Sequence, residues 1–332
     1  MPIPATTPTI RDQQPAPLPL PPQPVEWGHT HVTLTGSGGQ GEEIPLTAFA
    51  SREWPAVLIQ AGATGLDMPP VELYADDSPN LDGSIYRGSR VAARQVMIPV
   101  YLHGVDRRSL RELKRRLIRA VNPKNGPCLI RITEGDAQTR TLTVFYKDGL
   151  QGDEGVDSAG FRWTRYGLQF TAYDPWWYGP DLQVAEWSFG GGKPFLTSGK
   201  GLFPLSLSQG VLSNSSVPIV NPGDVEAWPV WQLKGPVRGF QLTGPDGGSF
   251  GISAGATGTP DAVPAGRVLT IDTRPGVKSI RDDQGVNLWP RLDGSPALWP
   301  VPAGNSKASV NLAAGGPAAS LRLTFRPRYE SY

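Results

Sequence analysis

The chain offers few residues that could perform nucleophilic, acid–base or metal chemistry. It has three histidines, His29, His31 and His103, and a single cysteine, Cys128. His29 and His31 share one face of a strand because side chains alternate along extended chain, but no third ligand follows at a suitable spacing. Cys128 opens an apolar, strand-like run, which favours a buried small side chain over a nucleophile. We therefore expect no catalytic residue, no metal site and no cofactor.

Two further patterns resemble known sites. Residues 36–41 read GSGGQG and formally match the dinucleotide fingerprint, but that fingerprint needs a helix opening at its last glycine, where Pro45 soon intervenes. We predict a hairpin loop there. Carboxylates are adjacent at 76–77, 153–154 and 282–283, whereas a glycosidase needs two that face each other across a cleft. A hydrolase of cell-wall polymer stays an open alternative, because linear sequence does not show which carboxylates face one another.

Residues 106–121 form the one clearly predicted helix. Asp106 is suited to cap it, and Asn122-Pro123 ends it. Its apolar stripe consists of Leu110, Leu113, Leu117, Ile118 and Val121. Its other face carries cations at 107, 108, 111, 114, 115, 116 and 119. A solvated face is favoured over a DNA-binding one, because no aromatic side chains interleave with the cations. Arg111, Arg115 and Arg119 are the candidate contacts with a neighbour's acidic surface.

Four of the eight residues in the run YDPWWYGP (173–180) are aromatic, and the run contains two prolines. Each proline favours a turn, and the run follows the last strand of the denser half of the chain. The rings therefore mark a hinge between two halves. Stacking on a sugar or a base is the alternative, but paired tryptophans more often pack. We predict that Trp176 and Trp177 are mostly buried between domains or subunits.

Composition predicts a β-rich protein of two domains. The chain has 332 residues, with 35 Pro, 40 Gly and a formal net charge of +1. That length favours two domains, and the charge balance excludes a strongly basic nucleic-acid-binding domain. No apolar segment approaches the length of a membrane span, and the N-terminus lacks the features of a signal peptide. We expect a soluble protein that either works in a reducing compartment or does not rely on disulfides.

The chain divides into four regions. Residues 1–24 hold nine prolines and form an extended arm, either a disordered tail or a strap on a neighbouring subunit. Residues 25–180 are predicted to form a β domain that contains the helix. Residues 181–216 are predicted to be a Gly/Ser/Pro-rich linker with loops, and 217–332 have the short, regularly spaced strands of a β-sandwich.

Two local predictions concern the first β domain. Residues 96–102 alternate as a strand, and Pro99 within them indicates an edge strand or a bulge, because proline cannot donate a ladder hydrogen bond. Residues 76–88 are predicted to be a polar loop that turns at Asp82-Gly83.

A series of short motifs, taken in order and spacing, resembles the distal tail protein of long-tailed, siphovirus-type bacteriophages. In the first half the matching segments are GLDMPP (65–70), Asp82-Gly83 leading to Arg94 and the strand through Gly104, the helix ending at 122–123, GPCL (126–129), YKDGL (146–150) and AYDPWWYG (172–179). In the second half they are VNPGDVEAWP (220–229), LKGP (233–236), LTIDT (269–273), DQG (283–285), PAGN (302–305) and FRPRY (325–329). The resemblance covers roughly residues 54–332.

This resemblance implies a fold class and a role. The fold is mainly β, with an N-terminal split-barrel-like β domain that has one α-helix, followed by a galectin-like β-sandwich domain. The first domain is implied to form a homo-hexameric ring that stacks on the tail tube protein and continues its channel for the tape measure protein and DNA. The sandwich projects outward, where tail-tip hub, fibre or receptor-binding proteins attach. The implied location is the tail tip of the virion, after synthesis in the bacterial host cytoplasm, and the family has no catalytic residues.

A carbohydrate-binding module is the competing class. Its stacking platforms in the sandwich would be Trp228, Trp231, Trp289 or Trp299. Glycan binding without a ring would favour it, and a ring of six copies would favour the tail-tip role.

Overall fold

The computed structural model describes most of the chain. The described residues are 30–47, 55–77, 79–80, 82–152, 162–179, 182–189, 215–255, 259–314 and 318–332. The proline-rich arm predicted at 1–24 lies outside them, as does His29.

The first half is built on one curved sheet. Its main path runs β2-β1-β7-β8-β9-β6-β3. The bounds are β1 His31–Thr35, β2 Glu43–Pro45, β3 Ala56–Ile59, β6 Arg94–His103, β7 Cys128–Thr133, β8 Thr139–Asp148 and β9 Trp163–Ala172. A bridge between Thr47 and Leu58 joins the two ends, so the sheet nearly closes into a barrel. The segment 36–41 connects β1 to its antiparallel partner β2, which confirms the predicted hairpin loop.

Strand β6 lies inside the sheet and pairs with β9 along its whole length without a register shift. The prediction that Pro99 marks an edge or a bulge is therefore wrong. The Pro99 carbonyl accepts a hydrogen bond from the Gln60 amide at 2.8 Å. Because the N and the C=O of a strand residue point the same way, the missing N–H faces β3 just past its last residue, Ile59. The ladder to β9 is left intact.

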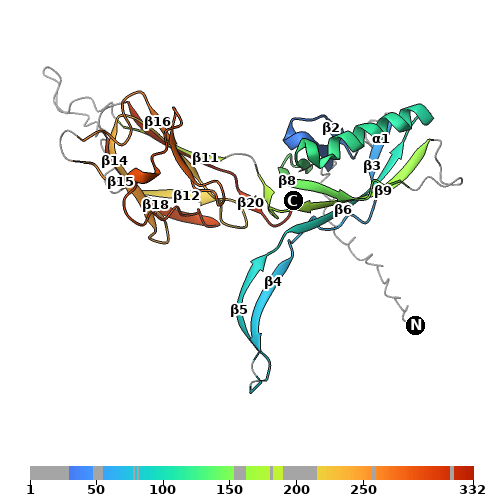
Figure 1. Cartoon of the computed structure of the whole chain (residues 1–332), viewed down its shortest axis with the longest axis horizontal. Helices are drawn as coiled ribbons and strands as arrows, with labels where there is room; N and C mark the ends of the chain where they lie inside the picture. Colours follow the sequence, from blue (N-terminus) through green and yellow to red (C-terminus); the bar gives the residue numbers. More distant parts are fainter. Residues whose placement is uncertain are drawn as a thin grey trace, which may run out of the picture.

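Helix α1 (Arg107–Val121) covers the inner face of this sheet (Figure 1). The Asp106 side chain accepts the Ser109 amide at 2.7 Å, and the Ser109 hydroxyl completes the capping box. The buried positions are Leu110, Leu113, Leu117 and Val121. Ile118 was predicted in this stripe but is 50% exposed. Consecutive helix residues are rotated by roughly 100° about the axis, so Ile118, which directly follows Leu117, lies beside the stripe.

Strands β4 (Val71–Asp77) and β5 (Ser84–Val91) form a separate hairpin that leaves the sheet (Figure 1). The predicted polar loop at 76–88 is therefore wrong for most of its length. Cross-strand pairing, with a bulge beside Tyr74, extends the ribbon to within a few residues of its tip.

The second half is a sandwich of two sheets around one apolar core (Figure 1). One sheet has the order β11-β19-β13-β16-β17 and the other β12-β18-β14-β15. The bounds are β11 Leu182–Phe189, β12 Ser215–Asn221, β13 Val230–Lys234, β14 Val237–Thr243, β15 Ser249–Ile252, β16 Val268–Asp272, β17 Ser279–Asp282, β18 Gly304–Ala314 and β19 Ala319–Phe325. The predicted linker at 181–216 is wrong for 182–189, because β11 pairs with β19 along that sheet. The mainly β fold with one described α-helix is as predicted.

Two short strands connect the halves. Strand β10 (Trp177–Tyr178) pairs with β8 and with β20 (Arg328–Tyr329), which follows the last sandwich strand. The end of the chain thus returns to the first half, where Figure 1 places the C-terminus.

Candidate functional site

Among the described strands and helices of the first half, the hairpin β4–β5 is the most exposed. Every residue of β4 is exposed. The register pairs Val71 with Val91 and Ala75 with Tyr86. Paired residues lie on the same face, and faces alternate along a strand. One face, the apolar hairpin face, therefore carries Val71, Leu73, Ala75, Tyr86 and Val91, with Ser89 among them and Asp77 and Ser84 near the tip.

The opposite hairpin face is charged and internally paired. Arg90 lies 2.8 Å from Glu72, and Arg87 lies 2.6 Å from Asp76. The Tyr74 hydroxyl also donates to Glu72, and these contacts lower the pKa of the Glu72 carboxyl. The hairpin is thus amphipathic, with one face suited to water and one that leaves Leu73 71% and Tyr86 63% exposed.

The predicted cationic site lies on the outer side of α1. Arg111, Arg115 and Arg119 are exposed and follow one another at four-residue spacing. Their neighbours are paired, since Arg116 contacts Glu42 at 2.8 Å and Arg108 contacts its own helix neighbour Glu112. Within the described part of the chain, no carboxylate lies within salt-bridge distance of the three candidates.

The two predicted tryptophans differ in burial. Trp177 is fully buried and donates its indole N–H to the Leu66 carbonyl at 2.8 Å. Its ring also meets the ring of Tyr332 edge-to-face at 5.9 Å. Trp176 is half-buried beneath the guanidinium of Arg328, 5.4 Å from its ring centre. Both therefore pack at the junction between the halves, with Trp177 the more deeply placed.

The sequence did not single out Arg94 as a functional residue. Its side chain is fully buried and donates to the Leu66 carbonyl, which also accepts the Trp177 indole N–H. Its guanidinium donates only to backbone carbonyls, those of Gly65, Leu66, Asp67, Pro175 and Glu330. Burial lowers the pKa of Arg94, and the charges of Asp67 and Glu330 oppose this. A signal was present, because period-two alternation places Arg94 on the same inward face as Val96 and Ile98.

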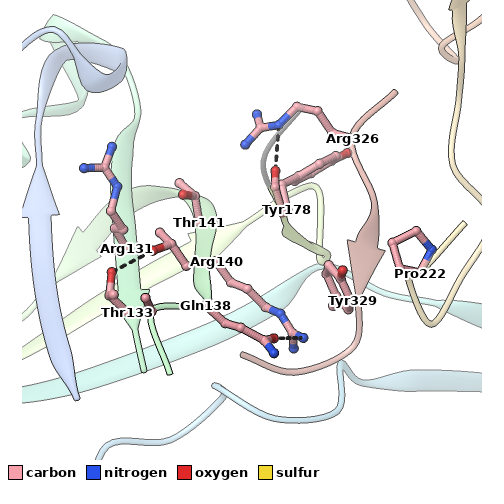
Figure 2. Close-up of a pocket in the computed structure, with 12 residues that line it drawn as sticks. Arg131, Thr133, Gln138, Arg140, Thr141, Tyr178, Pro222, Arg326 and Tyr329 are labelled. Atoms are coloured by element: carbon pink, nitrogen blue, oxygen red, sulfur yellow. Dashed lines mark hydrogen bonds between the residues drawn. The ribbon is translucent and has the colours of Figure 1, made fainter. Parts of the chain in front are cut away.

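Within the described residues, two clefts flank the junction. The larger, about 970 Å³, is drawn in Figure 2. It is lined by Arg131, Thr133, Ala137, Gln138, Thr139, Arg140, Thr141, Tyr178, Gly179, Pro222, Arg326 and Tyr329. This described lining contains no carboxylate, imidazole or thiol. The smaller cleft, about 440 Å³, shares Tyr178 and Arg326 with the first.

Polar groups that line the smaller cleft form hydrogen bonds and ion pairs within the chain. The Tyr178 hydroxyl donates to Asp174 at 2.6 Å. Burial, reinforced by that carboxylate, raises the pKa of Tyr178 to about 12. Arg274 is 2.5 Å from Asp272, and Arg328 is 3.7 Å from the Glu226 carboxylate. These contacts serve the junction itself, so we interpret the clefts as parts of an intramolecular joint.

The sandwich retains few of the platforms that glycan stacking would need. Trp231 and Trp299 are buried in its core and pack edge-to-face at 5.6 Å, so they were wrongly proposed as platforms. Trp228 is half-buried beside Lys278, and Trp289 is 38% exposed.

The remaining chemical candidates do not gather into one site within the described residues. Cys128 is buried, and that burial raises the pKa of its thiol to about 11. His103 lies 3.1 Å from the Tyr101 hydroxyl. Over the described ranges, no three His, Cys, Asp or Glu side chains group as metal ligands. No helix in those ranges is long and apolar enough to cross a membrane.

Comparison with known proteins identifies the fold. No protein-family model matches the sequence, and no curated protein matches it. Among solved structures, the Dit protein of phage SPP1 matches with a TM-score of 0.59 and 16% identity, over 90% of this chain and 98% of that one. Its structure is described as a paradigm of the hub adsorption apparatus in phages that infect Gram-positive bacteria.

Structures of the phage P2 baseplate in its activated conformation also match. With calcium and with strontium alike, the TM-score is 0.51 at 10% identity, over 92% of this chain and 100% of the baseplate chain. Both halves are therefore included in each match. The chain thus has the fold of SPP1 Dit, and it shares that fold with a component of the phage P2 baseplate.

Proposed function

We propose that this chain is a structural protein of a bacteriophage tail tip, and that copies of it form a ring at the distal end of the tail tube. The observation that carries the proposal is the apolar hairpin face, which has no partner within the described chain. The shared fold with a hub protein supports it, since that likeness spans both halves.

The hairpin needs a partner for a physical reason. A two-stranded ribbon alone is marginally stable in water, and it gains stability by packing an apolar face. Burying a side chain such as Leu73 or Tyr86 stabilises by roughly 1.5–3 kcal/mol. Within the chain these side chains stay exposed. A second copy would cover them and would offer its own hairpin to the next copy.

Such a head-to-tail contact closes into a ring when the rotation between copies allows it. We propose a hexamer whose first halves, residues 25–180, form the ring and continue the channel of the tail tube. Tape measure protein and DNA would pass through without sequence-specific binding, in keeping with a net charge of only +1. The sandwich, predicted at residues 217–332 and extended by β11 and the start of β12, would project outward to tail-tip hub, fibre or receptor-binding proteins. The role is non-enzymatic.

The oligomeric state tests this proposal. Mass photometry and negative-stain electron microscopy of the full chain should find rings of six. Changing the apolar face by Leu73→Asn with Tyr86→Asn should shift the population to monomers. Ile85→Asn is the matched control. Ile85 is also exposed and precedes Tyr86 in the sequence, but its side chain lies on the charged face, so this change should leave rings intact.

Two outcomes would count against the proposal. A monomer at every concentration, combined with binding of glycans by the full chain, would favour the carbohydrate-binding alternative. Rings that persist in the double variant would show that the hairpin face is not the contact between copies.

A further inference from the structure

The buried guanidinium of Arg94 joins three segments that are far apart in the sequence. It donates to the carbonyls of residues 65–67 at the base of the hairpin, to Pro175 in the aromatic run at 2.8 Å, and to Glu330 near the end of the chain at 2.6 Å. Arginine presents five N–H donors in one rigid plane. Nη1, with two N–H groups, is shared among the carbonyls of residues 65–67, while Nε donates to Pro175 and Nη2 to Glu330, so all three nitrogens are engaged by backbone carbonyls.

The first of these segments sets where the hairpin begins. Gly65 has φ of +80°, and a Cβ at this position would lie 1.9 Å from the Gln95 carbonyl oxygen. The segment thus lies tightly against β6 next to Arg94. The Ala92 amide donates to the Pro70 carbonyl at 2.8 Å and closes the base of the hairpin. The position of residues 65–67 therefore determines how the hairpin leaves the sheet.

The second contact point is the end of the chain. After the sandwich, residues 328–332 run back along the first half. Ser331 donates its hydroxyl to the Asp67 carboxylate at 3.0 Å, and its carbonyl accepts from Arg140 at 2.9 Å. The Arg140 guanidinium also lies over the Tyr329 ring at 3.7 Å, a contact visible in Figure 2.

The same terminal segment is tied to the sandwich side of the joint. The Glu330 amide donates to the Asp224 carboxylate at 3.0 Å. The amide of Asp224 in turn donates to the Arg328 carbonyl at 2.9 Å. Glu330 therefore contacts both sides of the joint. Its carbonyl accepts from Arg94 at the base of the hairpin, and its amide donates to Asp224 in the loop that precedes β13.

We propose that Arg94 is a positioning residue that couples the hairpin to the sandwich through residues 328–332. The direction of the hairpin is set by the end of the chain, so that a displacement of the sandwich is transmitted to the contact between copies. The coupling itself follows from intramolecular contacts. Its consequence for assembly rests on the proposed function of the hairpin.

Two spin labels would measure this coupling. Asp82→Cys places one at the hairpin tip and Lys307→Cys places one on the sandwich, while buried Cys128 stays unlabelled in the folded protein. Double electron–electron resonance on the otherwise native chain, diluted with unlabelled protein, should give one narrow distance distribution. Removal of residues 330–332, or the change Arg94→Met, should broaden it at least twofold.

Three further measurements separate positioning from general stability. Arg94→Lys keeps the charge but not the planar donors, so its distribution should stay broad. Arg267→Ala removes two sandwich ion pairs, with Asp282 and Asp283, that do not line either cleft of the joint, and it should lower stability without broadening the distance distribution. If Arg94→Met does not fold, the truncated chain still gives the test, with circular dichroism as the check on folding.

An unchanged width in the folded, truncated chain would overturn the proposal. The distance measurement does not depend on ring formation. A coupled hairpin in a protein that forms no ring would therefore refute the proposed function alone, whereas a ring with an uncoupled hairpin would refute this inference alone.

Discussion

At the scale of single residues, burial separates neighbours that look alike in the sequence. Trp176 and Trp177 are adjacent, yet Trp177 lies in the core of the first half while Trp176 is half-buried beneath the Arg328 guanidinium. The difference follows from β10, in which Trp177 pairs with Tyr329 and turns its indole toward Leu66.

This difference predicts unequal losses of stability. Trp177→Ala should lower the free energy of unfolding by about 3–5 kcal/mol, the usual cost of emptying a buried aromatic site. Trp176→Ala should cost about 1 kcal/mol, because part of that ring already faces solvent. Urea denaturation followed by circular dichroism measures both. Equal losses would contradict the burial described for the two rings.

Tyr178 gives the joint a pH dependence. Burial and Asp174 raise its pKa to about 12, above the ordinary value of 10. The unfolded chain therefore loses this proton at lower pH than the folded chain does. The stability from Tyr178 is full below pH 10 and is lost as the pH rises toward 12.

The expected loss between pH 10 and 12 is about 2 kcal/mol, from the relation between pKa and free energy. Urea unfolding at pH 9, 10 and 11.5 should show a steeper decline for the native chain than for Tyr178→Phe. Parallel declines in the two proteins would show that this hydroxyl does not titrate differently on unfolding.

At the scale of elements, α1 presents an uncompensated line of charge. Arg111, Arg115 and Arg119 span about 12 Å along the helix, at 1.5 Å per residue. Exposed ion pairs such as Arg108–Glu112 contribute little to stability. Arg111, Arg115 and Arg119 are exposed and have no carboxylate within salt-bridge distance in the described chain, so they are available for an acidic neighbour. We propose that this neighbour is another subunit or an adjoining tail protein.

Charge reversal tests this contact. The triple change Arg111→Glu, Arg115→Glu and Arg119→Glu should reduce ring formation at least tenfold, as judged by mass photometry at physiological salt. A matched control makes the same change in charge on exposed sandwich positions, with Lys234→Glu, Arg238→Glu and Lys307→Glu. Assembly that is disturbed equally in both variants would point to net charge rather than to the helix face.

At the scale of the whole molecule, two separate cores are connected by one compact joint. The first core is closed by α1 and the curved sheet, and the second lies between the two sheets of the sandwich. Figure 1 shows the sandwich on one side, the helix-covered sheet on the other, and the hairpin leaving near their junction. In a ring, this arrangement would give each half its own set of contacts, with Arg94 and the end of the chain between them.

The local features of this fold were predictable because they depend on residues close together in the sequence. Helix α1 is specified by nearby residues alone. These are the capping Asp106, the spaced leucines Leu110, Leu113 and Leu117, and the proline after Asn122. Period-two alternation likewise predicts β6 and β9. The glycine loop at 36–41 could be distinguished from a cofactor site because Pro45 is incompatible with the helix that such a site needs.

The tertiary structure decided everything that depends on a partner strand or a distant carbonyl. Pro99 is harmless in an interior strand because its missing N–H falls beyond the end of β3, and β11 forms in a predicted linker because β19 offers it an edge. The site of Arg94 also depends on distant groups. Alternation along β6 places its side chain inward among apolar residues, where it needs hydrogen-bond acceptors. Its carbonyl acceptors come from segments more than 200 residues apart, and only folding brings them within reach of one guanidinium.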